Sequence, residues 1–385
     1  MGNKLLTSLK LGLLVLMLYS LTGCWSSSNI QDQHYTAAIG IDFDGENYIL
    51  YAQTLNFASI ASTEGAQGTT PDNSSYVGKG VGKSMHLAAS DLYKAAQLRI
   101  EWGHTQAVIV SERALMAKDS ELVDQVYRFP DNRYNVWFFV TQEPIDKLLE
   151  SDTFYNFTTL RTIIHMPESS YNQTMTLPPI QMFKYLSFVN EPDRLSYVPC
   201  LGFNETSWES QTKQLKLPVI TAGYFASDKV KKMIKIEDIK GYRWAQPKLT
   251  RTMLLVKDEK KDYAVVLVHK AKVKKKVVLV DGQVKFNIEA SYRGSMDEYI
   301  EEIDYEDMIK LAEEQIKQEI IETYNFGVEE ELDFFNLMHS FRMKNPSRWK
   351  QMTKNGQEFI LTKNSINEIK VKLVVSTNGK YKRQK

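Results

Sequence analysis

The stretch QAVIVSERALMAK, residues 106–118, decides the fold class of this chain. Its first part, residues 106–110, is a short apolar run that predicts a buried strand, and a helical pattern follows over residues 112–128. The same order recurs, because NVWFFV at residues 135–140 predicts another strand and Pro144 opens a helix that includes residues 145–149. Strands that alternate with helices predict an α/β (α+β) protein, with helices packed on mixed or antiparallel sheets.

The residues before this stretch predict a hairpin and a helix. Two segments rich in aliphatic and aromatic residues, 35–43 and 48–57, flank an Asp-Gly pair, which is a strong turn signal. Residues 83–99 carry apolar side chains at helical spacing. GKGVGKS at residues 78–84 approaches the phosphate-binding loop G-x-x-x-x-G-K-[ST], but Val77 stands where the first glycine belongs. We therefore interpret it as a glycine-rich turn that enters the helix.

The second half of the chain predicts a small unit and then a larger one. In the small unit we expect a strand at 217–224, a lysine-rich helix at 228–234 and a strand at 251–256. The larger unit contains four predicted strands and one long helix. The strands are residues 263–268, 270–280, 284–291 and 366–376, and the helix is residues 304–325 with one apolar stripe.

These elements predict three domains, each built from a sheet with helices packed on it. A length of 385 residues exceeds one typical core. The irregular, proline-containing residues 151–199 are the best place for a boundary. We expect an N-terminal α/β domain over 35–195, a small middle domain over 196–262 and a C-terminal α/β domain over 263–385.

The first residues predict an export signal. Residues 1–23 combine a short basic region, about 11 apolar residues and small residues at the end, which is the order of a signal peptide. A membrane-spanning helix needs roughly 20 apolar residues, so a permanent span is the weaker interpretation. The end, Leu21-Thr22-Gly23-Cys24, resembles a bacterial lipobox. That resemblance implies S-diacylglycerol and N-acyl modification of Cys24, with residues 24–34 as a lipidated tether.

Composition excludes several functional classes. With 48 basic and 47 acidic residues the formal net charge is +1, and loss of Lys4 and Lys10 with the signal peptide makes it −1. Neither value supports nucleic-acid binding, which requires a basic excess. If Cys24 carries lipid, Cys200 is the remaining cysteine and no disulfide can form within the chain.

Catalytic and metal-binding patterns are weak throughout the sequence. None of the six histidines pairs with another histidine or a cysteine at the spacing of metal ligands. We interpret Cys200 as a buried bystander, and no serine elbow occurs. The run at residues 272–276, KVKKK, could contact anionic lipid, although a solvated strand face or hairpin end is favoured. We expect a protein that is not an enzyme, without a cofactor or an assigned small-molecule site.

Several segments, taken in order, resemble the Ger(x)C family, the lipoprotein C subunits of spore nutrient germinant receptors. Coverage extends over essentially the whole chain. The segments are LTGCW with AAIGID at residues 37–42, EWGHTQAVIVSERALMAK at 101–118, Arg133 with VWFFV, AGYFASDKVKKMI at 222–234 and ETYNFGVEEELDFFNLMHSFRMKNPSRWK at 322–350. This chain departs from the family pattern at Ser26-Ser27-Ser28 and around Asp333, where DFFNLMHS replaces a glycine-rich stretch.

The resemblance implies three mixed α/β domains on the outer face of the spore inner membrane. It implies assembly with two polytopic membrane subunits into a receptor for nutrients, with a structural and signal-coupling role. The lipid on Cys24 would hold the body at the membrane. The alternative function is a lipoprotein substrate-binding subunit of a transporter, which would need two similar lobes around a cleft.

Overall fold

The computed structural model describes most of the chain from residue 33 onward. The described residues are 33–55, 75–127, 133–174, 177–210, 214–227, 230–246, 249 and 251–376, together with residues 2, 10 and 12. Cys24 and the predicted loop at residues 59–73 therefore lie outside the described part.

The first sheet has nine strands in the order β3-β2-β1-β5-β6-β7-β8-β9, with β4 beside β1. Its middle strands, β1, β5, β6 and β7, run parallel, whereas both flanks are antiparallel. The strands are β1 (Gln33–Phe43), β2 (Tyr48–Leu55), β3 (Ser75–Gly82), β4 (Arg99–Glu101), β5 (Ala107–Ser111), β6 (Trp137–Thr141), β7 (Ser196–Asn204), β8 (Leu217–Ala226) and β9 (Lys231–Lys235).

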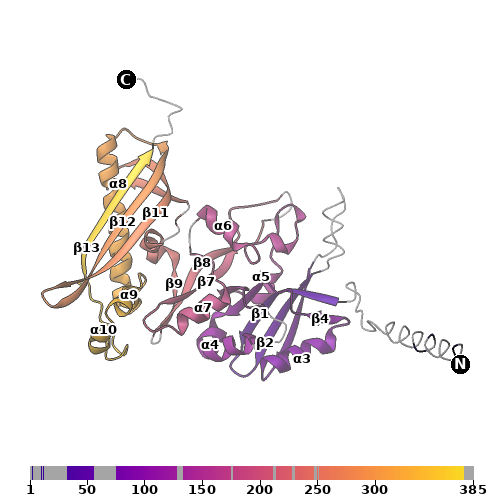
Figure 1. The fold of residues 1–385 in the computed structure, drawn as a ribbon. Coiled ribbons are helices and arrows are strands. Elements are labelled where there is room, and N and C mark those ends of the chain that lie inside the picture. The colour runs from indigo at the N-terminus through magenta and orange to yellow at the C-terminus, as the bar shows by residue number, and fades with distance from the viewer. Residues whose placement is uncertain are drawn as a thin grey trace.

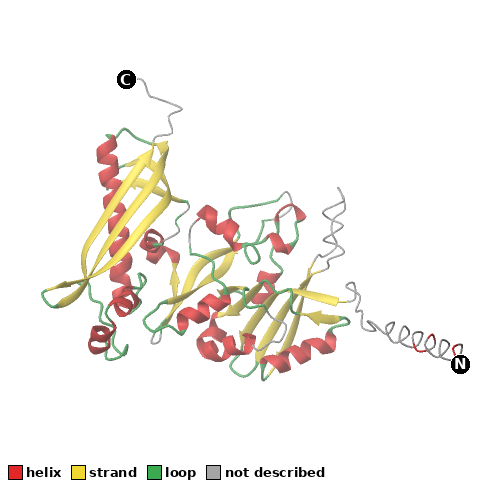
Figure 2. Ribbon diagram, viewed as in Figure 1, coloured by secondary structure: helices red, strands yellow, loops and turns green. Residues whose placement is uncertain are grey.

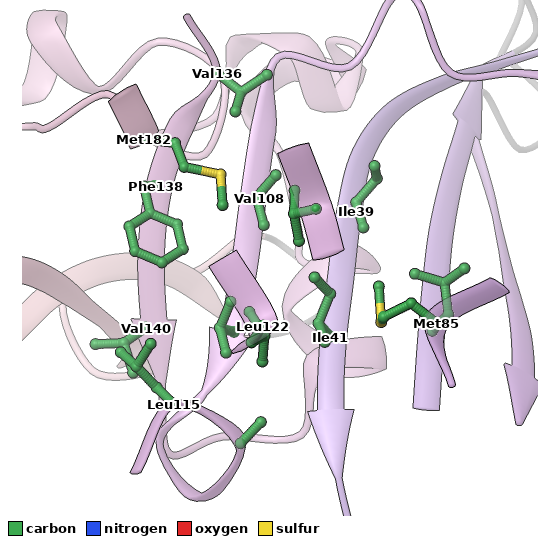
Figure 3. Packing of buried hydrophobic residues seen from close by; sticks show 14 of the residues in the cluster. Ile39, Ile41, Met85, Val108, Leu115, Leu122, Val136, Phe138, Val140 and Met182 are labelled. Carbon is green, nitrogen blue, oxygen red and sulfur yellow. The ribbon is translucent and has the colours of Figure 1, made fainter. Parts of the chain in front are cut away.

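Helices cover both faces of this sheet. They are α3 (Met85–Ala95), α4 (Glu112–Tyr127), α5 (Ile145–Leu149), α6 (Pro167–Thr174) and α7 (Met182–Val189), with short 3₁₀ turns η2 (Phe154–Asn156) and η3 (Thr159–Arg161). Alternate strand residues enter different cores, because side chains along a strand point to opposite faces. Val108 and Phe138 belong to the cluster drawn in Figure 3, which includes Met85 of α3, Leu115 of α4 and Met182 of α7. Ile109 belongs to a second cluster on the other face, with residues of α5.

The second sheet has four strands in the order β10-β11-β12-β13. These are β10 (Thr252–Lys257), β11 (Asp262–Val280), β12 (Gln283–Tyr299) and β13 (Ile366–Ser376). The long helix α8 (Tyr305–Glu329) lies along one face, and Figure 2 shows it in red beside the yellow strands. Asp304 caps the helix, since its side chain accepts hydrogen bonds from the amides of Glu306 and Asp307. Two short helices, α9 (Leu337–Lys344) and α10 (Pro346–Met352), follow α8 in the sequence. The 3₁₀ segment η4 (Ile236–Ala245) connects the last strand of the first sheet, β9, to the first strand of the second, β10.

The mixed α/β class is confirmed, and so are most of the predicted elements. The hairpin of β1 and β2, the strand β5 followed by α4, and the amphipathic helix α8 all form. Met308, Ala312, Ile316 and Ile320 make the buried stripe of α8. The described sheets differ in size and topology, so they are not the two similar lobes that the transporter alternative needs.

Two element predictions are wrong. The glycine-rich segment before α3 is strand β3 and not a turn, and its glycines let the strand approach the helix. A Cβ on Gly80 would lie 2.1 Å from the Ala88 carbonyl oxygen. Residues 231–234 of the expected lysine-rich helix belong instead to strand β9, which pairs with β8. Seven residues are too few for a helical period to outweigh pairing with a neighbouring strand.

The predicted middle domain shares its strands between the two sheets. Strands β7, β8 and β9 extend the first sheet, and Val140 of β6 pairs directly with Cys200 of β7. Strand β10 was expected in the small unit, but it pairs with β11 in the second sheet. Strand pairing alone does not define folding units, so the division at residues 195 and 262 stays a prediction.

Candidate functional site

A polar cluster lies at the carboxyl ends of the parallel strands β1 and β5. The Asp42 carboxylate, near the end of β1, accepts hydrogen bonds from Ser111 Oγ at 2.5 Å and from Arg113 Nε at 2.7 Å. A second Arg113 nitrogen, Nη2, bonds the other carboxylate oxygen, and the Phe43 amide donates at 2.8 Å. Ser111 Oγ also accepts from the Ala114 amide at 3.1 Å, so the cluster ties β1 to the start of α4.

The electrostatics of this cluster favour a permanent ion pair. Burial by itself raises the pKa of Asp42, but the hydrogen bonds from Arg113, Ser111 and the Phe43 amide outweigh it and hold the pKa below its usual value. The hydrogen bond to Asp42 also raises the pKa of Arg113. Both groups therefore stay charged near neutral pH. The arrangement holds two elements together, and it has no group ready to transfer a proton.

A second polar cluster lies where the two sheets meet, between α8 and α9. The Asp333 carboxylate accepts a hydrogen bond from the Met338 amide at 2.7 Å, and burial raises the pKa of Asp333 to about 6. Nearby, Lys275 Nζ donates to the Phe335 carbonyl oxygen at 2.6 Å, and burial lowers the pKa of Lys275. Asp333 Oδ1 has no hydrogen-bond partner among the described residues.

Residues of the first sheet reach this junction from the segment after α7. Leu195 N donates to Asn336 Oδ1 at 3.0 Å, across 141 residues of sequence. Glu191 is paired with Arg194 at 2.7 Å and lies 3.6 Å from His339 of α9. These contacts connect the segment after α7 to α9, so polar groups surround the place where the two sheets meet.

The centre of the junction is apolar and aromatic. Phe225 of β8 meets Phe334 edge-on, with ring centroids 5.0 Å apart. Both belong to one buried cluster that joins strands β8 and β9 of the first sheet to η4 and to the segment between α8 and α9. Its members are Leu177, Leu195, Phe225, Ile234, Ile239, Tyr242, Leu332 and Phe334. The first sheet is therefore joined to the helical layer of the second sheet by a packed core with polar groups around it.

A cleft of about 400 Å³ lies beside this junction, between η4, β10 and α8. Its wall includes the ion pair of Arg243 with Glu319, at 3.1 Å, and Glu319 also accepts from the Trp244 indole at 2.7 Å. Gln315 Nε2 donates to the Leu255 carbonyl oxygen, and Gln315 Oε1 accepts from the Lys257 amide. The Gln315 side chain thus satisfies two backbone groups, the Leu255 carbonyl and the Lys257 amide, on the free edge of β10.

The structure places the other predicted site residues as follows. Cys24 lies outside the described residues, so its lipidation stays a prediction. Cys200 is buried as expected, and burial raises the pKa of its thiol to about 11, which disfavours the thiolate. His165 is buried beside Gln53 at 3.0 Å, and burial lowers its pKa to about 4. No group of metal-ligating side chains that could hold an ion occurs within the described ranges.

Sequence reasoning missed both polar clusters. Asp42 lies in AAIGID, and Ser111 and Arg113 lie in the strand–helix stretch, which the sequence analysis treated separately. For Asp42 and Ser111 the usable signal was their position at the ends of two predicted strands, because parallel strands end at the same edge of a sheet. Within the part of the chain that is described, no helix has the length and apolar character to cross a bilayer.

This architecture defines a class of protein in which a large mixed sheet and a smaller sheet with one long helix share a packed junction. Two family models match the chain. One, for the N-terminal domain of spore germination proteins, covers residues 26–202, and the other, for the spore germination B3/GerAC-like C-terminal domain, covers residues 221–379. The chain belongs to this GerAC-like family of spore germination proteins.

Individual relatives agree with this assignment. The crystal structure of the GerBC protein superimposes with a TM-score of 0.53 at 10% sequence identity, covering 88% of this chain and 96% of that one, which shows a shared fold. YfkR of Bacillus subtilis (strain 168), described as a spore germination protein, is 27% identical over 135 residues. That match spans 34% of this chain and 35% of YfkR.

Proposed function

We propose that this chain is a membrane-anchored lipoprotein subunit of a spore nutrient germinant receptor. It acts by assembling with two polytopic membrane subunits and coupling their response to nutrients, and not by catalysis. The observation that carries the proposal is the pair of family matches at residues 26–202 and 221–379, the first of which begins two residues after the lipobox-like cysteine.

The anchor supplies the physical reason for the location. Each buried CH₂ of a lipid contributes about 0.8 kcal/mol, so one acyl chain holds weakly and two or more hold firmly. S-diacylglycerol and N-acyl groups on Cys24 would confine the body to the outer face of the spore inner membrane. Confinement raises its effective concentration near membrane partners, which favours assembly without any new contact.

The described geometry agrees with a coupling role. Both polar clusters connect secondary-structure elements: Asp42 with Arg113 ties β1 to α4, and the Glu191 and Asn336 contacts connect the first sheet to α9. A body with such a junction can pass a displacement at one sheet to the other, because packed cores move as units.

The decisive experiment measures the release of dipicolinic acid from spores after nutrient addition. We would compare wild type, a deletion, Cys24→Ala and Cys200→Ala. The last variant is the matched control, because it removes the other cysteine at a site with no proposed lipid. We expect loss of the response in the deletion, loss or weakening in Cys24→Ala, and near wild-type release in Cys200→Ala.

A biochemical assay separates anchoring from signalling. Cells that produce each variant are fed a fatty acid that can be labelled, and the label and the membrane fraction are followed. Label on wild type and Cys200→Ala, with none on Cys24→Ala, supports the anchor. Equal labelling of all three would contradict it, and normal nutrient responses in the deletion would contradict the receptor role.

A further inference from the structure

The outer face of the second sheet carries a dense array of cations. Residues of β11, β12 and β13 that point toward α8 are buried, among them Phe286, Tyr292 and Leu373. Their neighbours in sequence point the other way, because side chains alternate along a strand. Six cations on this opposite face make no ion pair within the described residues: Lys270, Lys272, Lys274, Lys285, Arg293 and Lys372.

Strand register brings these residues together. Lys270 lies opposite Arg293, and Ser291 lies between Lys272 on one side and Lys372 on the other. Adjacent strands are about 4.8 Å apart and residues on one face repeat at about 6.8 Å along a strand, so the charges form a close grid. We call this surface the cationic sheet face.

Few carboxylates offset this charge. On the same face Glu289 pairs with Lys276 at 2.6 Å, and Glu368 pairs with Lys370 at 3.0 Å. Lys274 also lies opposite Glu289, and Glu298, opposite Val265 farther along β12, makes no ion pair within the described residues. Positive charge still exceeds negative charge on this face. The whole chain has a net charge of +1, so this face differs sharply from the remainder of the protein.

We propose that the cationic sheet face binds the anionic head groups of a phospholipid bilayer. Such surfaces attract basic side chains by about 1 kcal/mol for each lysine or arginine that lies close to them. Helices α8 and α9 pack on the opposite face, so the cationic side is open to a flat partner among the described elements (Figure 1). The proposed membrane location rests on the receptor function above, whereas the binding itself belongs to this face.

The composition of the face favours lipid over an acidic protein. Protein interfaces carry aromatic or apolar anchors at their centre and are depleted in lysine there. Here five of the six cations named above are lysines, whose ammonium groups stay hydrated in a head-group layer.

The position of the cationic sheet face would let it orient the protein on the membrane. Strand β1, where the described body begins, lies at the opposite end of the molecule from the second sheet (Figure 1). A lipid attached through the tether before β1 would leave the body free to tilt. A second contact at the far end would lay the body along the bilayer, because two linked contacts reinforce each other.

The test uses the chain from residue 25 onward, which keeps every strand and helix described above and carries no lipid. Flotation measures its binding to vesicles of phosphatidylcholine alone and of phosphatidylcholine mixed equally with phosphatidylglycerol. We expect binding to the anionic vesicles only, and a loss of that binding at high salt because mobile ions screen the attraction. The variant Lys270→Glu/Lys272→Glu/Lys372→Glu should bind at least about tenfold more weakly.

A matched control keeps the same total charge. Lys94→Glu/Lys184→Glu/Lys350→Glu changes three exposed lysines on helices α3, α7 and α10 and should bind like wild type. Circular dichroism checks that both variants fold. Equal binding to neutral vesicles, no binding to anionic vesicles, or equal weakening by both variants would overturn the proposal. A germination defect in the first variant without any vesicle binding would point to an acidic protein instead, and would also overturn it.

Failure of this inference is distinguishable from failure of the proposed function. The vesicle assay contains no lipidated cysteine and no partner subunit, so its outcome does not depend on Cys24. Conversely, the spore assays with Cys24→Ala and Cys200→Ala leave the cationic sheet face unchanged.

Discussion

The Gly241 amide donates a hydrogen bond to Thr323 Oγ1 at 2.9 Å, which joins η4 directly to the C-terminal half of α8. The contact is so close that a Cβ on Gly241 would lie 2.1 Å from the Glu319 carbonyl oxygen. Glycine is therefore the residue that allows the segment between the sheets to lie against the long helix. This single contact sets how closely η4 approaches α8 and the core of the second sheet.

We predict that Gly241→Ala destabilises the protein by about 2–4 kcal/mol, because the added methyl group must push backbone away from backbone. Urea unfolding followed by circular dichroism measures the loss. Lys240→Ala, an exposed neighbour in the same segment, is the control and should change stability by less than about 0.5 kcal/mol. Equal effects of the two variants would contradict the close-contact explanation.

The ion pair of Asp42 with Arg113 predicts a stability difference that depends on pH. The pKa of folded Asp42 lies below the unfolded value, so its contribution is present above about pH 4 and is lost as pH falls through the folded pKa. Arg113→Met should therefore destabilise the protein by about 1–2 kcal/mol at pH 7, an estimate reduced for the exposure of the guanidinium. The difference from wild type should shrink toward pH 3.

The control for this prediction is Lys147→Met, which removes a solvent-exposed pair with Glu150. Exposed pairs contribute about 0–1 kcal/mol, so this variant should lie close to wild type at every pH. If Arg113→Met behaved in the same way, the Asp42 cluster would not be holding β1 to α4.

Asp333 predicts the opposite pH trend. Burial raises the pKa of the folded carboxyl to about 6, above the unfolded value of about 3.9, so the folded state holds its proton more tightly. This group therefore favours folding most below about pH 4, and that contribution is lost as pH rises toward 6. Relative to wild type, Asp333→Asn should become more stable by on the order of 2 kcal/mol between pH 4 and pH 7.

Measurement requires unfolding curves of Asp333→Asn and wild type at several pH values. Asp258→Asn is a suitable control, because Asp258 lies on an exposed turn where hydrogen bonds from Tyr263 and from two amides lower its pKa. Its pH trend should have the other sign. A stability gap between Asp333→Asn and wild type that did not change with pH would show that burial does not govern this carboxyl.

The Phe225–Phe334 contact predicts how the two sheets unfold. Phe334→Ala removes an aromatic ring from the centre of the junction, which should cost about 3–5 kcal/mol. Because the lost packing connects the two halves of the molecule, we expect hydrogen exchange to show that one sheet opens while the other stays folded. Phe138→Ala, in the core of the first sheet alone, is the control and should weaken that sheet without separating the two. Simultaneous opening in both variants would argue against a junction that couples the sheets.

The local sequence was sufficient to predict elements that repeat an apolar pattern over many residues or that contain a distinctive turn. The apolar stripe of α8 and the Asp-Gly hairpin both act within a few residues. The helix predicted at residues 228–234 was wrong because a short, lysine-rich segment has no clear period, and lysines are common on edge strands such as β9. The turn predicted at residues 78–84 was wrong because its glycines resembled a turn signal, although they serve the close approach of α3.

The lysine run shows the same limit. Sequence favoured a solvated strand face, and Lys272, Lys274 and Lys276 are indeed exposed in β11. Lys275 points inward, where its ammonium group meets the Phe335 carbonyl oxygen, because alternate residues of a strand face opposite sides. Nothing near Lys275 in sequence could reveal that partner, which lies 60 residues away.

The sequence by itself determined the α/β class, the order of most strands and helices, the lipobox-like Cys24 and the resemblance to a germination family, since each depends on residue type and short spacing. Tertiary structure alone decided the ion pair between Asp42 and Arg113, the burial of Asp333 at the junction and the cationic sheet face. Those features join residues that are about 70 or more positions apart, or that become neighbours only when strand register is set. Register follows from the hydrogen bonds of the complete sheet and from the packing of its buried face, which no local window contains.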